Sequence, residues 1–228
     1  MTAGGALEKG TGHGASRPAR RLNEQEIVTA ALGLAGRVGF DNLSMRGLAE
    51  ELDVTPMAIY YHVGNKKALL ALVTDSILGR IRVPDPDVGD WTTRLLLLHE
   101  ETSRVLSPYP GIDAMMIDLG LTAQGRRLMD ANIRILLDAG FDERGALLAY
   151  NVLHSYGVGR VTIESRLRGR PRPATSDVSS LPALERIRGA VPGLHAADYR
   201  SFGYDAIVRG LQDLLADQAA REPDDQHP

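Results

Sequence analysis

Hydrophobic residues recur at helical spacing along most of the chain, and no segment of useful length shows the alternation of a β-strand. In the first such segment, apolar residues follow one another at i, i+3, i+4, i+7, i+8 and i+11, which places them on one face of an α-helix. Asn23, with Glu26 three residues later, has the pattern of a capping box, and Gly39 is a typical helix stop. The apolar face consists of Ile27, Ala30, Ala31, Leu34, Ala35 and Val38.

Two shorter helices are predicted next, separated by turns of a few residues. Ser44 is a suitable N-cap for the first, and the second runs from Thr55 to about His62, before Gly64 interrupts it. Between them, Asp53 occupies a tight turn that needs a left-handed residue, a conformation that Asp tolerates. Three short helices joined by tight turns are typical of a helix-turn-helix. The inward positions of the second helix of the three are Met45, Leu48, Ala49 and Leu52.

The rest of the chain is also predicted to be helical. A fourth helix runs from Asn65 to about Ile81 and ends before a linker punctuated by prolines. The fold class is therefore all-α: a three-helix helix-turn-helix domain at 20–66 is joined by the fourth helix to a larger helical domain at 67–220, with disordered tails at 1–19 and 221–228. A short helix is expected at Ile112–Leu119. Longer helices are expected at Trp91–Leu106, Ala123–Ala139, Asp142–Leu167 and Asp198–Ala219.

Charge is distributed unevenly along the chain, although the formal net charge is only −3. Residues 17–70 carry seven basic and six acidic side chains, whereas the chain from residue 71 carries 18 basic and 22 acidic ones. A modest basic footprint on an otherwise acidic protein is compatible with phosphate contact by one small surface. The basic side chains at the two ends of the first region are Arg17, Arg20, Arg21, Lys66 and Lys67.

Cysteine is absent, which excludes disulfides, thiolate zinc sites and cysteine nucleophiles. No apolar run approaches the ~20 residues of a membrane-spanning helix, and the N-terminus lacks the hydrophobic core of a signal peptide. We therefore expect a soluble cytoplasmic protein that has no membrane partner.

A cluster of Tyr60, Tyr61 and His62 stands just before Asn65 and Lys66, and it is too aromatic for an ordinary solvated face and too polar for a core. In a helix-turn-helix, the first turns of the last helix enter the major groove of DNA. The cluster would then lie at the exit of the reading helix, with the Tyr60 hydroxyl on the phosphate side; Tyr60 as a core residue is the alternative. Asn65 would cap the fourth helix, whose N-terminal amides form an anion site together with Lys66.

The start of the reading helix supplies the residues expected to face the bases. Thr55 can form hydrogen bonds with a base edge, while Met57 and Ala58 can contact a thymine methyl group. Arg46, in the preceding helix, can reach a base or a phosphate. The candidate DNA-binding residues are therefore Arg46, Thr55, Met57, Ala58, Tyr60, Tyr61, His62 and Lys66.

The stretch "GFDNLSMRGLAEELDVTPMAIYYHVGNKKALL" resembles the N-terminal domain of the TetR family of transcriptional repressors, and its Y-x-H-V-x-N-K pattern is especially close to the tetracycline repressors. Trp91, "DLG" at 118–120 and "AGF" at 139–141 extend a weaker similarity, so that roughly residues 20–219 are covered. The resemblance implies a homodimer, double-stranded operator DNA as a partner, and a C-terminal ligand-binding and dimerisation domain. A small-molecule effector in that domain would release the DNA.

Several positions depart from the family pattern. Asp53 stands where Gly is usual, and residues 56–58 change the set that reads bases, so the operator sequence is not inherited. The tetracycline repressors hold a magnesium–drug complex with a histidine and a glutamate. Here Asp118 stands near the place of that histidine and Glu164 is one residue out of register, which argues against tetracycline as the ligand.

Scattered polar residues on the apolar helices of the larger domain are candidates for orienting a ligand. His99 and His154 could equally be satisfied interior histidines. No metal site and no cofactor are expected. Dimerisation is expected through Asp142–Leu167 and Asp198–Ala219, since both helices are long and carry small residues that permit close approach. The candidate ligand-binding residues are His99, Asp118, Asn132 and His154.

Two other function classes are weighed against a DNA-binding regulator. The chain has no nucleophile elbow, zinc-protease motif, phosphate loop or dinucleotide fingerprint, so we do not expect an enzyme. The main rival is a helical small-molecule-binding or scaffold protein without DNA-binding activity. The stretch "RGRPRP" at Arg168–Pro173 is interpreted as a solvated loop, with a minor-groove hook as the alternative.

Overall fold

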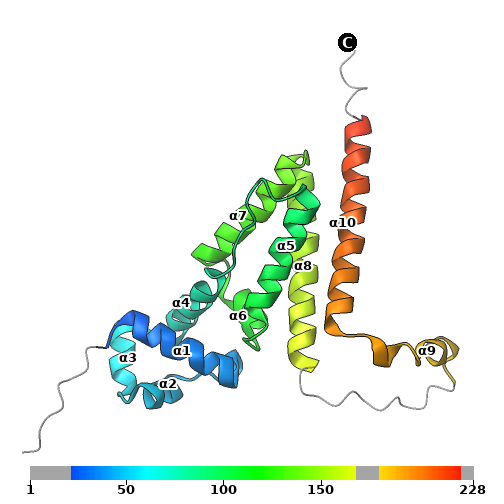
Figure 1. Cartoon of the computed structure of the whole chain (residues 1–228). Helices are drawn as coiled ribbons and strands as arrows, with labels where there is room; N and C mark the ends of the chain where they lie inside the picture. Colours follow the sequence, from blue (N-terminus) through cyan, green and yellow to red (C-terminus); the bar gives the residue numbers. More distant parts are fainter. Residues whose placement is uncertain (1–21, 168–179, 222–228) are drawn as a thin grey trace, which may run out of the picture.

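The computed structural model describes residues 22–167 and 180–221, and within these two ranges it contains helices and no strands (Figure 1). The all-α fold class predicted from the sequence is confirmed. The "RGRPRP" stretch and the predicted tail at 1–19 lie outside the described residues, as does the predicted tail at 221–228 except for Arg221, which is the last residue of the final helix. The first part of the chain forms α1 (Glu24–Val38), the 3-10 helix η1 (Phe40–Asn42), α2 (Met45–Leu52), α3 (Pro56–Val63) and α4 (Lys66–Leu78).

Local capping interactions set the boundaries of these helices. Asn23 and Glu26 form the predicted capping box, in which each side chain accepts a hydrogen bond from the other residue's backbone N–H. Ser44, Thr55 and Asn65 cap α2, α3 and α4, each accepting a hydrogen bond from a backbone N–H in the first turn. These caps explain why the helices begin where the sequence predicts.

Asp53 ends α2 in the left-handed conformation that the tight turn requires, with φ 55° and ψ 47°. The turn aims α3 across α2, and a common core holds the first three helices together. Val38, predicted on the apolar face of α1, is 38% exposed at the last position of that helix. The largest fully buried side chains of the core are Ile27, Phe40, Leu43, Leu48 and Ile59.

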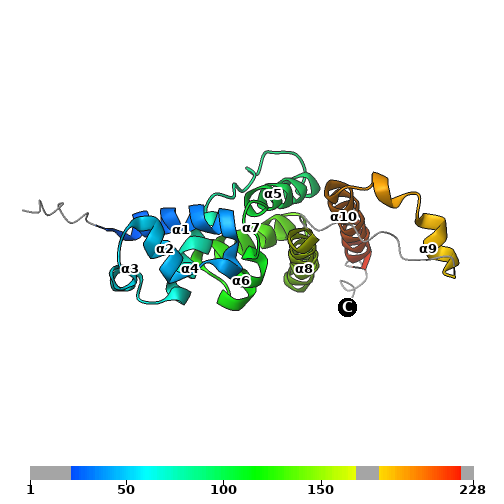
Figure 2. The ribbon, with the colours of Figure 1, turned by 90° about the horizontal axis from the view of Figure 1, so that it is seen from below.

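The second part of the chain is a larger helical body in which α10 lies along α8, and α9 projects away from the other helices (Figures 1 and 2). None of the described helices is both long and apolar enough to cross a membrane. The helices are α5 (Trp91–Leu106), α6 (Ile112–Leu119), α7 (Ala123–Asp138), α8 (Glu143–Leu167), α9 (Pro182–Ile187) and α10 (Ala196–Arg221), with the 3-10 helix η2 at Val191–Gly193.

The small unit formed by α1–α3 is attached to the larger body at two places. Helix α4 continues directly from the small unit into the body. In addition, the Phe40 backbone N–H donates to the Pro110 carbonyl at 2.8 Å. Gly39 permits this close approach, since its φ is 81° and a Cβ there would lie 3.3 Å from the Pro110 carbonyl oxygen.

The C-terminal end of α4 is fastened to the start of α7. The Asp75 carboxylate accepts a hydrogen bond from the Gln124 backbone N–H at 2.7 Å. Arg127 donates to the carbonyls of Leu78 and Ile81, at and just beyond the end of α4, at 3.3 and 2.9 Å. The helix that carries the small unit is therefore bound to a helix of the body.

Candidate DNA-binding surface and ligand cavity

Helix α3 buries one narrow face and leaves the rest exposed at the outer edge of the small unit (Figure 1). Its buried side chains are Ile59 and Val63. By contrast, Met57 is 73% exposed and Tyr61 is 88% exposed, which is unusual for large apolar and aromatic side chains in a folded unit. A short helix that presents such side chains outward is suited to contact another molecule.

The other predicted DNA-binding residues on and beside α3 differ in how far they are exposed. Thr55 and His62 are exposed, and Ala58 is half-buried. The Thr55 hydroxyl oxygen accepts from the Ala58 backbone N–H at 3.3 Å, so its O–H remains able to donate. Tyr60 is 37% exposed, so part of its side chain is covered and part is accessible to another molecule.

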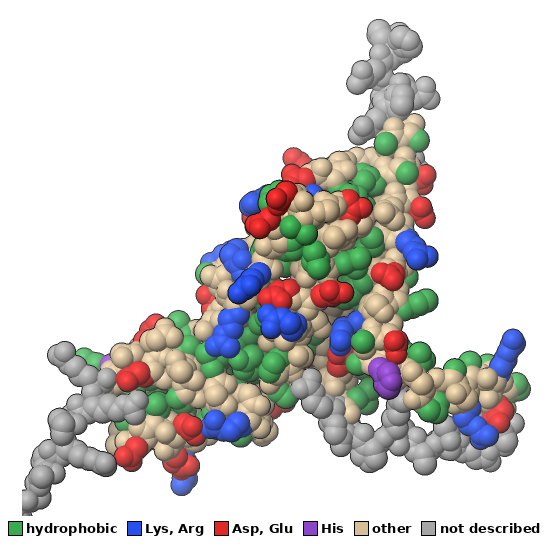
Figure 3. Space-filling view, in the orientation of Figure 1, with side chains coloured by type: hydrophobic (Ala, Val, Ile, Leu, Met, Phe, Trp, Pro, Cys, Tyr) green, Lys and Arg blue, Asp and Glu red, His purple; other side chains and the backbone are tan. Residues whose placement is uncertain are grey.

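The candidate phosphate-binding cations Arg46 and Lys66 lie on α2 and α4, which both pack against α3. Arg46 pairs with Glu50 at 3.0 Å, with its side chain 87% exposed. Such a solvent-exposed pair is weak, so the guanidinium remains available to a phosphate. Lys66 is exposed at the first position of α4, whose free N-terminal N–H groups favour an anion. Acidic side chains are also visible on this unit, so the positive surface is small (Figure 3).

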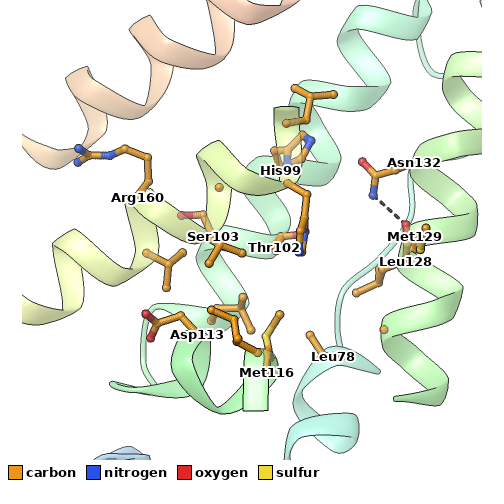
Figure 4. A pocket seen from close by; sticks show the side chains of 18 of the residues that line it. Leu78, His99, Thr102, Ser103, Asp113, Met116, Leu128, Met129, Asn132 and Arg160 are labelled. Carbon is orange, nitrogen blue, oxygen red and sulfur yellow. Dashed lines mark hydrogen bonds between the residues drawn. The ribbon is translucent and has the colours of Figure 1, made fainter. Parts of the chain in front are cut away.

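A cavity of about 270 Å³ lies in the larger body, with walls from α4, α5, α6, α7, α8 and α10 (Figure 4). Most of its lining is apolar, as is common for small-molecule sites. The apolar residues that line it include Leu78, Leu106, Met116, Leu128, Met129 and Leu153.

Several polar atoms in the cavity wall are buried without a hydrogen-bond partner. Five such side-chain atoms occur in the described part of the chain, and four of them belong to residues that line the cavity. Since buried polar groups are nearly always paired, this concentration indicates a site that is completed by another molecule. The four atoms are Thr74 Oγ1, His99 Nε2, Asn132 Oδ1 and Arg160 Nε.

Both histidines of the cavity are held in their neutral form. Burial, together with a smaller effect of the neighbouring His154, lowers the pKa of His99 to about 4. Burial also lowers the pKa of His154. The His99 ring stacks on Tyr204 at 4.6 Å between ring centroids, and the His154 ring stacks on Tyr150 at 5.4 Å. The cavity therefore offers uncharged imidazoles among aromatic rings.

Three of the four predicted ligand-binding residues, His99, Asn132 and His154, line this cavity. Asp118 does not; it is exposed on α6. Asp113, on the same helix, is 5% exposed and lines the cavity instead, where its carboxylate accepts a hydrogen bond from Thr162. Five positions correspond to roughly 140° of rotation around an α-helix, which is why the two carboxylates point to different sides.

Glu164 lies beside the cavity but is neutralised by two arginines. It pairs with Arg160 at 3.1 Å and with Arg200 at 2.5 Å, while the Arg160 guanidinium also lies 5.3 Å from the centre of the Tyr199 ring. Within 22–167 and 180–221, no group of acidic and histidine side chains is arranged to hold a metal ion. Sequence reasoning missed the cavity residues Thr74, Asp113, Arg160, Arg200 and Tyr204; the charge of Arg160 in an apolar stretch of helix was the one signal that could have indicated a role.

Large apolar side chains are exposed along α8 and α10, and hydrophobic patches are visible on α10 in Figure 3. Phe202 on α10 is 78% exposed, more than any other phenylalanine described. Exposed apolar surface that continues over two neighbouring long helices is typical of a protein–protein contact. Other side chains of this surface are Leu147, Leu148, Val152, Tyr199 and Leu214.

Both parts of the chain match domains of known regulatory proteins. Residues 27–73 match the bacterial regulatory proteins of the tetR family, and residues 83–199 match the tetracyclin repressor-like C-terminal domain. An HTH-type transcriptional regulator of Saccharopolyspora erythraea is 30% identical over 209 residues, which cover 90% of this chain and 88% of the relative. The class D tetracycline repressor protein of Escherichia coli is 29% identical over 201 residues, covering 86% and 88%. The structure of the TetR family protein ActR of Streptomyces coelicolor in complex with actinorhodin has a TM-score of 0.73 and 26% identity, covering 85% of this chain and 98% of that chain.

Proposed function

Because this chain belongs to the TetR family of bacterial transcriptional regulators, we propose that it represses transcription as a homodimer that binds a palindromic DNA operator and is released by a small molecule. One observation carries the ligand-responsive part of the proposal. The cavity with four unpaired polar atoms is walled in part by α4, the helix that leads directly to the candidate DNA-binding surface. We assign residues 20–66 to DNA binding and residues 67–220 to ligand binding and dimerisation, and we place the protein in the cytoplasm.

Helix α3 enters the major groove in this proposal. Met57 and Tyr61 reach the base edges, which their exposure supports, and Thr55, Ala58 and His62 complete the reading surface. Phosphates are contacted by Arg46, Tyr60 and Lys66, which position the helix without reading sequence.

The dimer forms through the exposed apolar surface of α8 and α10, whose four helices from two protomers make the interface. A two-fold dimer presents two α3 helices, which must be about 34 Å apart to read neighbouring half-sites on one face of DNA. The apolar character of Phe202, Leu148 and their neighbours supports this assignment.

The effector occupies the cavity and is a largely apolar small molecule. The structure of ActR, which is similar to this chain, contains actinorhodin, and this supports a small-molecule effector for this chain as well. A ligand that prefers a different spacing of the two α3 helices lowers DNA affinity by thermodynamic linkage. By reciprocity, operator DNA lowers ligand affinity by the same factor.

A gel-shift assay with the purified chain and the DNA upstream of its own gene tests the proposal. We expect a retarded band that persists in the presence of competitor DNA of unrelated sequence. The Lys66→Ala variant should weaken binding to all sequences alike and reduce the salt dependence by about one ion, because Lys66 contacts a phosphate. Arg144→Ala, in the first turn of α8, is the control and should bind as the unaltered protein does.

Failure of the wild-type chain to retard this or any selected DNA would favour the alternative, a helical small-molecule-binding or scaffold protein without DNA-binding activity. An unchanged salt slope for Lys66→Ala would remove Lys66 from the proposed surface while leaving the rest of it in place.

A further inference from the structure

Three of the unpaired atoms in the cavity come from helices that pack against one another. Thr74 lies on α4, His99 on α5 and Asn132 on α7. Thr74 is completely buried and Asn132 is 7% exposed. The fourth unpaired atom, Nε of Arg160 on α8, lies on the opposite side of the cavity from Asn132 in Figure 4. We refer to Thr74, His99 and Asn132 as the polar triad.

The hydrogen-bonding capacity of the polar triad is defined by the bonds already made. The Asn132 amide NH₂ donates to the Leu128 carbonyl at 2.8 Å, so its free Oδ1 can only accept. The Thr74 hydroxyl can both donate and accept. The His99 ring is uncharged, since its pKa is lowered to about 4, and its Nε2 has no partner.

Charged side chains line other walls of the cavity. Asp113 lies on α6, Arg160 on α8 and Arg200 on α10, and each of the three already has a partner of its own. A carboxylate placed at the polar triad would have no cation beside it, and an ammonium group would have no carboxylate. Burial of an unpaired charge is costly, so charged groups are disfavoured there.

Building on the ligand response proposed above, we propose that the polar triad binds an uncharged hydroxyl group on an otherwise apolar ligand, and that its bond to Thr74 is the polar contact of the ligand with α4. The hydroxyl donates to the Asn132 oxygen and accepts a second hydrogen bond from the Thr74 hydroxyl. The rest of the ligand then lies against the leucines and methionines of the cavity.

The position of Thr74 gives this bond a consequence for DNA binding. Helix α4 begins at Lys66, beside the candidate DNA-binding surface, and ends where Asp75 and Arg127 join it to α7. A group that binds Thr74 and Asn132 together acts across the packing of α4 on α7. The hydroxyl therefore selects the relative position of these helices, rather than merely filling space.

The first test needs no ligand. Thr74→Val replaces an unpaired hydroxyl with a methyl group of similar shape, so the melting temperature of the full chain should stay the same or rise. Thr102→Val is the matched control, because Thr102 also lines the cavity but its hydroxyl donates to the Leu98 carbonyl at 2.7 Å. This control should lower the melting temperature. A lower melting temperature for Thr74→Val would overturn the proposal, since it would mean that the hydroxyl serves the free structure.

The second test measures binding of three probes that share one ring system: 2-naphthol, naphthalene and 2-naphthoate. We expect 2-naphthol to bind tightest, and Thr74→Val or Asn132→Leu to weaken it by about three- to tenfold while leaving naphthalene unchanged. The Thr102→Val control should retain the preference for 2-naphthol. Equal binding of 2-naphthol and naphthalene, tighter binding of 2-naphthoate, or no saturable binding of 2-naphthol would each overturn the proposal.

Operator binding by the same variants separates this proposal from the proposed function. If Thr74→Val binds DNA as the wild type does but loses the preference for 2-naphthol, both proposals are supported. If the wild type binds no DNA, the proposed function fails, whereas the probe series still decides the chemistry of the cavity.

Discussion

The His99 side chain illustrates how a single residue acquires its properties from its surroundings. Stacking on Tyr204 and burial in the cavity wall remove water from its ring, and a charged imidazole is disfavoured without water or a carboxylate partner. The residue is neutral at physiological pH for this reason. It acts as a polar aromatic group rather than as a cation.

The lowered pKa of His99 predicts how stability depends on pH. In the unfolded chain the group titrates near 6.5, whereas in the folded protein it titrates at about 4, so the unfolded state binds the extra proton first as pH falls. The contribution is fully present above pH 6.5 and is lost between pH 6.5 and 4, up to about 3 kcal/mol. As the pH falls from 7 to 4.5, the His99→Phe variant should therefore lose less unfolding free energy than the wild type does. Urea titrations of both proteins at pH 7, 5.5 and 4.5 measure this difference.

The neighbouring groups do not change this expectation, because His154, Asp113, Arg160 and Arg200 are the same in both proteins. If the unfolding free energy of the wild type and of His99→Phe fell equally as the pH was lowered, His99 would not be the group responsible for the loss of stability at acidic pH.

Asp53 gives a second prediction at the residue scale. It is the one non-glycine residue with positive φ among those described, and a side chain in this conformation is strained. Asp53→Gly should raise the free energy of unfolding by up to about 1 kcal/mol, whereas Asp53→Ala should not raise it. Urea denaturation of the three proteins measures the difference, and a Gly variant less stable than the wild type would contradict the explanation.

At the scale of the helices, the sequence was informative wherever the structural cause is local. Ser44, Thr55 and Asn65 act on the backbone N–H groups within one turn of themselves, so their pattern predicts where α2, α3 and α4 begin. The family resemblance also depended on this local pattern, and it is confirmed by the comparisons.

The cavity was less predictable because its walls come from helices that are distant in sequence. Helix α6 has apolar residues on all sides, so nothing local distinguishes Asp113 from Asp118. In the sequence, nothing distinguishes Thr74 from other residues within a helix. Only the packing of α5 and α7 on α4 places it in the cavity wall. The sequence could predict that polar groups meet a ligand, but not which turn of α6 faces inward.

Gly203 determines how closely α10 packs on α8. A Cβ at this position would lie 1.9 Å from the Tyr156 hydroxyl oxygen, which itself donates to the Tyr199 carbonyl at 2.5 Å. Gly203→Ala must therefore displace Tyr156 or separate the helices, and we expect a loss of about 1–3 kcal/mol in unfolding free energy. Since the next residue, Tyr204, stacks on His99, binding of 2-naphthol should weaken as well.

The control for this substitution is Gly33→Ala in α1. Gly33 is exposed and a Cβ there makes only an ordinary 3.5 Å contact with Arg37, so the same change should stabilise the helix by up to about 1 kcal/mol. A lower melting temperature for Gly203→Ala together with a higher one for Gly33→Ala would support the packing argument. A neutral Gly203→Ala would mean that Tyr156 moves aside without cost.

For the whole molecule, the proposed dimer can be separated from DNA binding by two substitutions of the same kind. Phe202→Glu places a charge on the apolar surface of α10 and should yield a monomer in sedimentation at micromolar concentration. A monomer should also bind the palindrome more weakly, because it contacts one half-site at a time.

Met57→Glu is the matched variant, since Met57 is 73% exposed but lies on α3. It should remain dimeric and lose DNA binding, because a carboxylate replaces an apolar contact with the base edges and is repelled by the negative charge of DNA. A dimeric Phe202→Glu protein would require the interface to lie elsewhere.

The double attachment of the small unit also has a mechanical meaning. One attachment is the chain itself, where α4 enters the body, and the other is the contact of Phe40 with Pro110. Because α1 and α3 also pack on α4, the small unit cannot move independently of that helix. A displacement of α4 near Thr74 is therefore carried to α3 and to Tyr61.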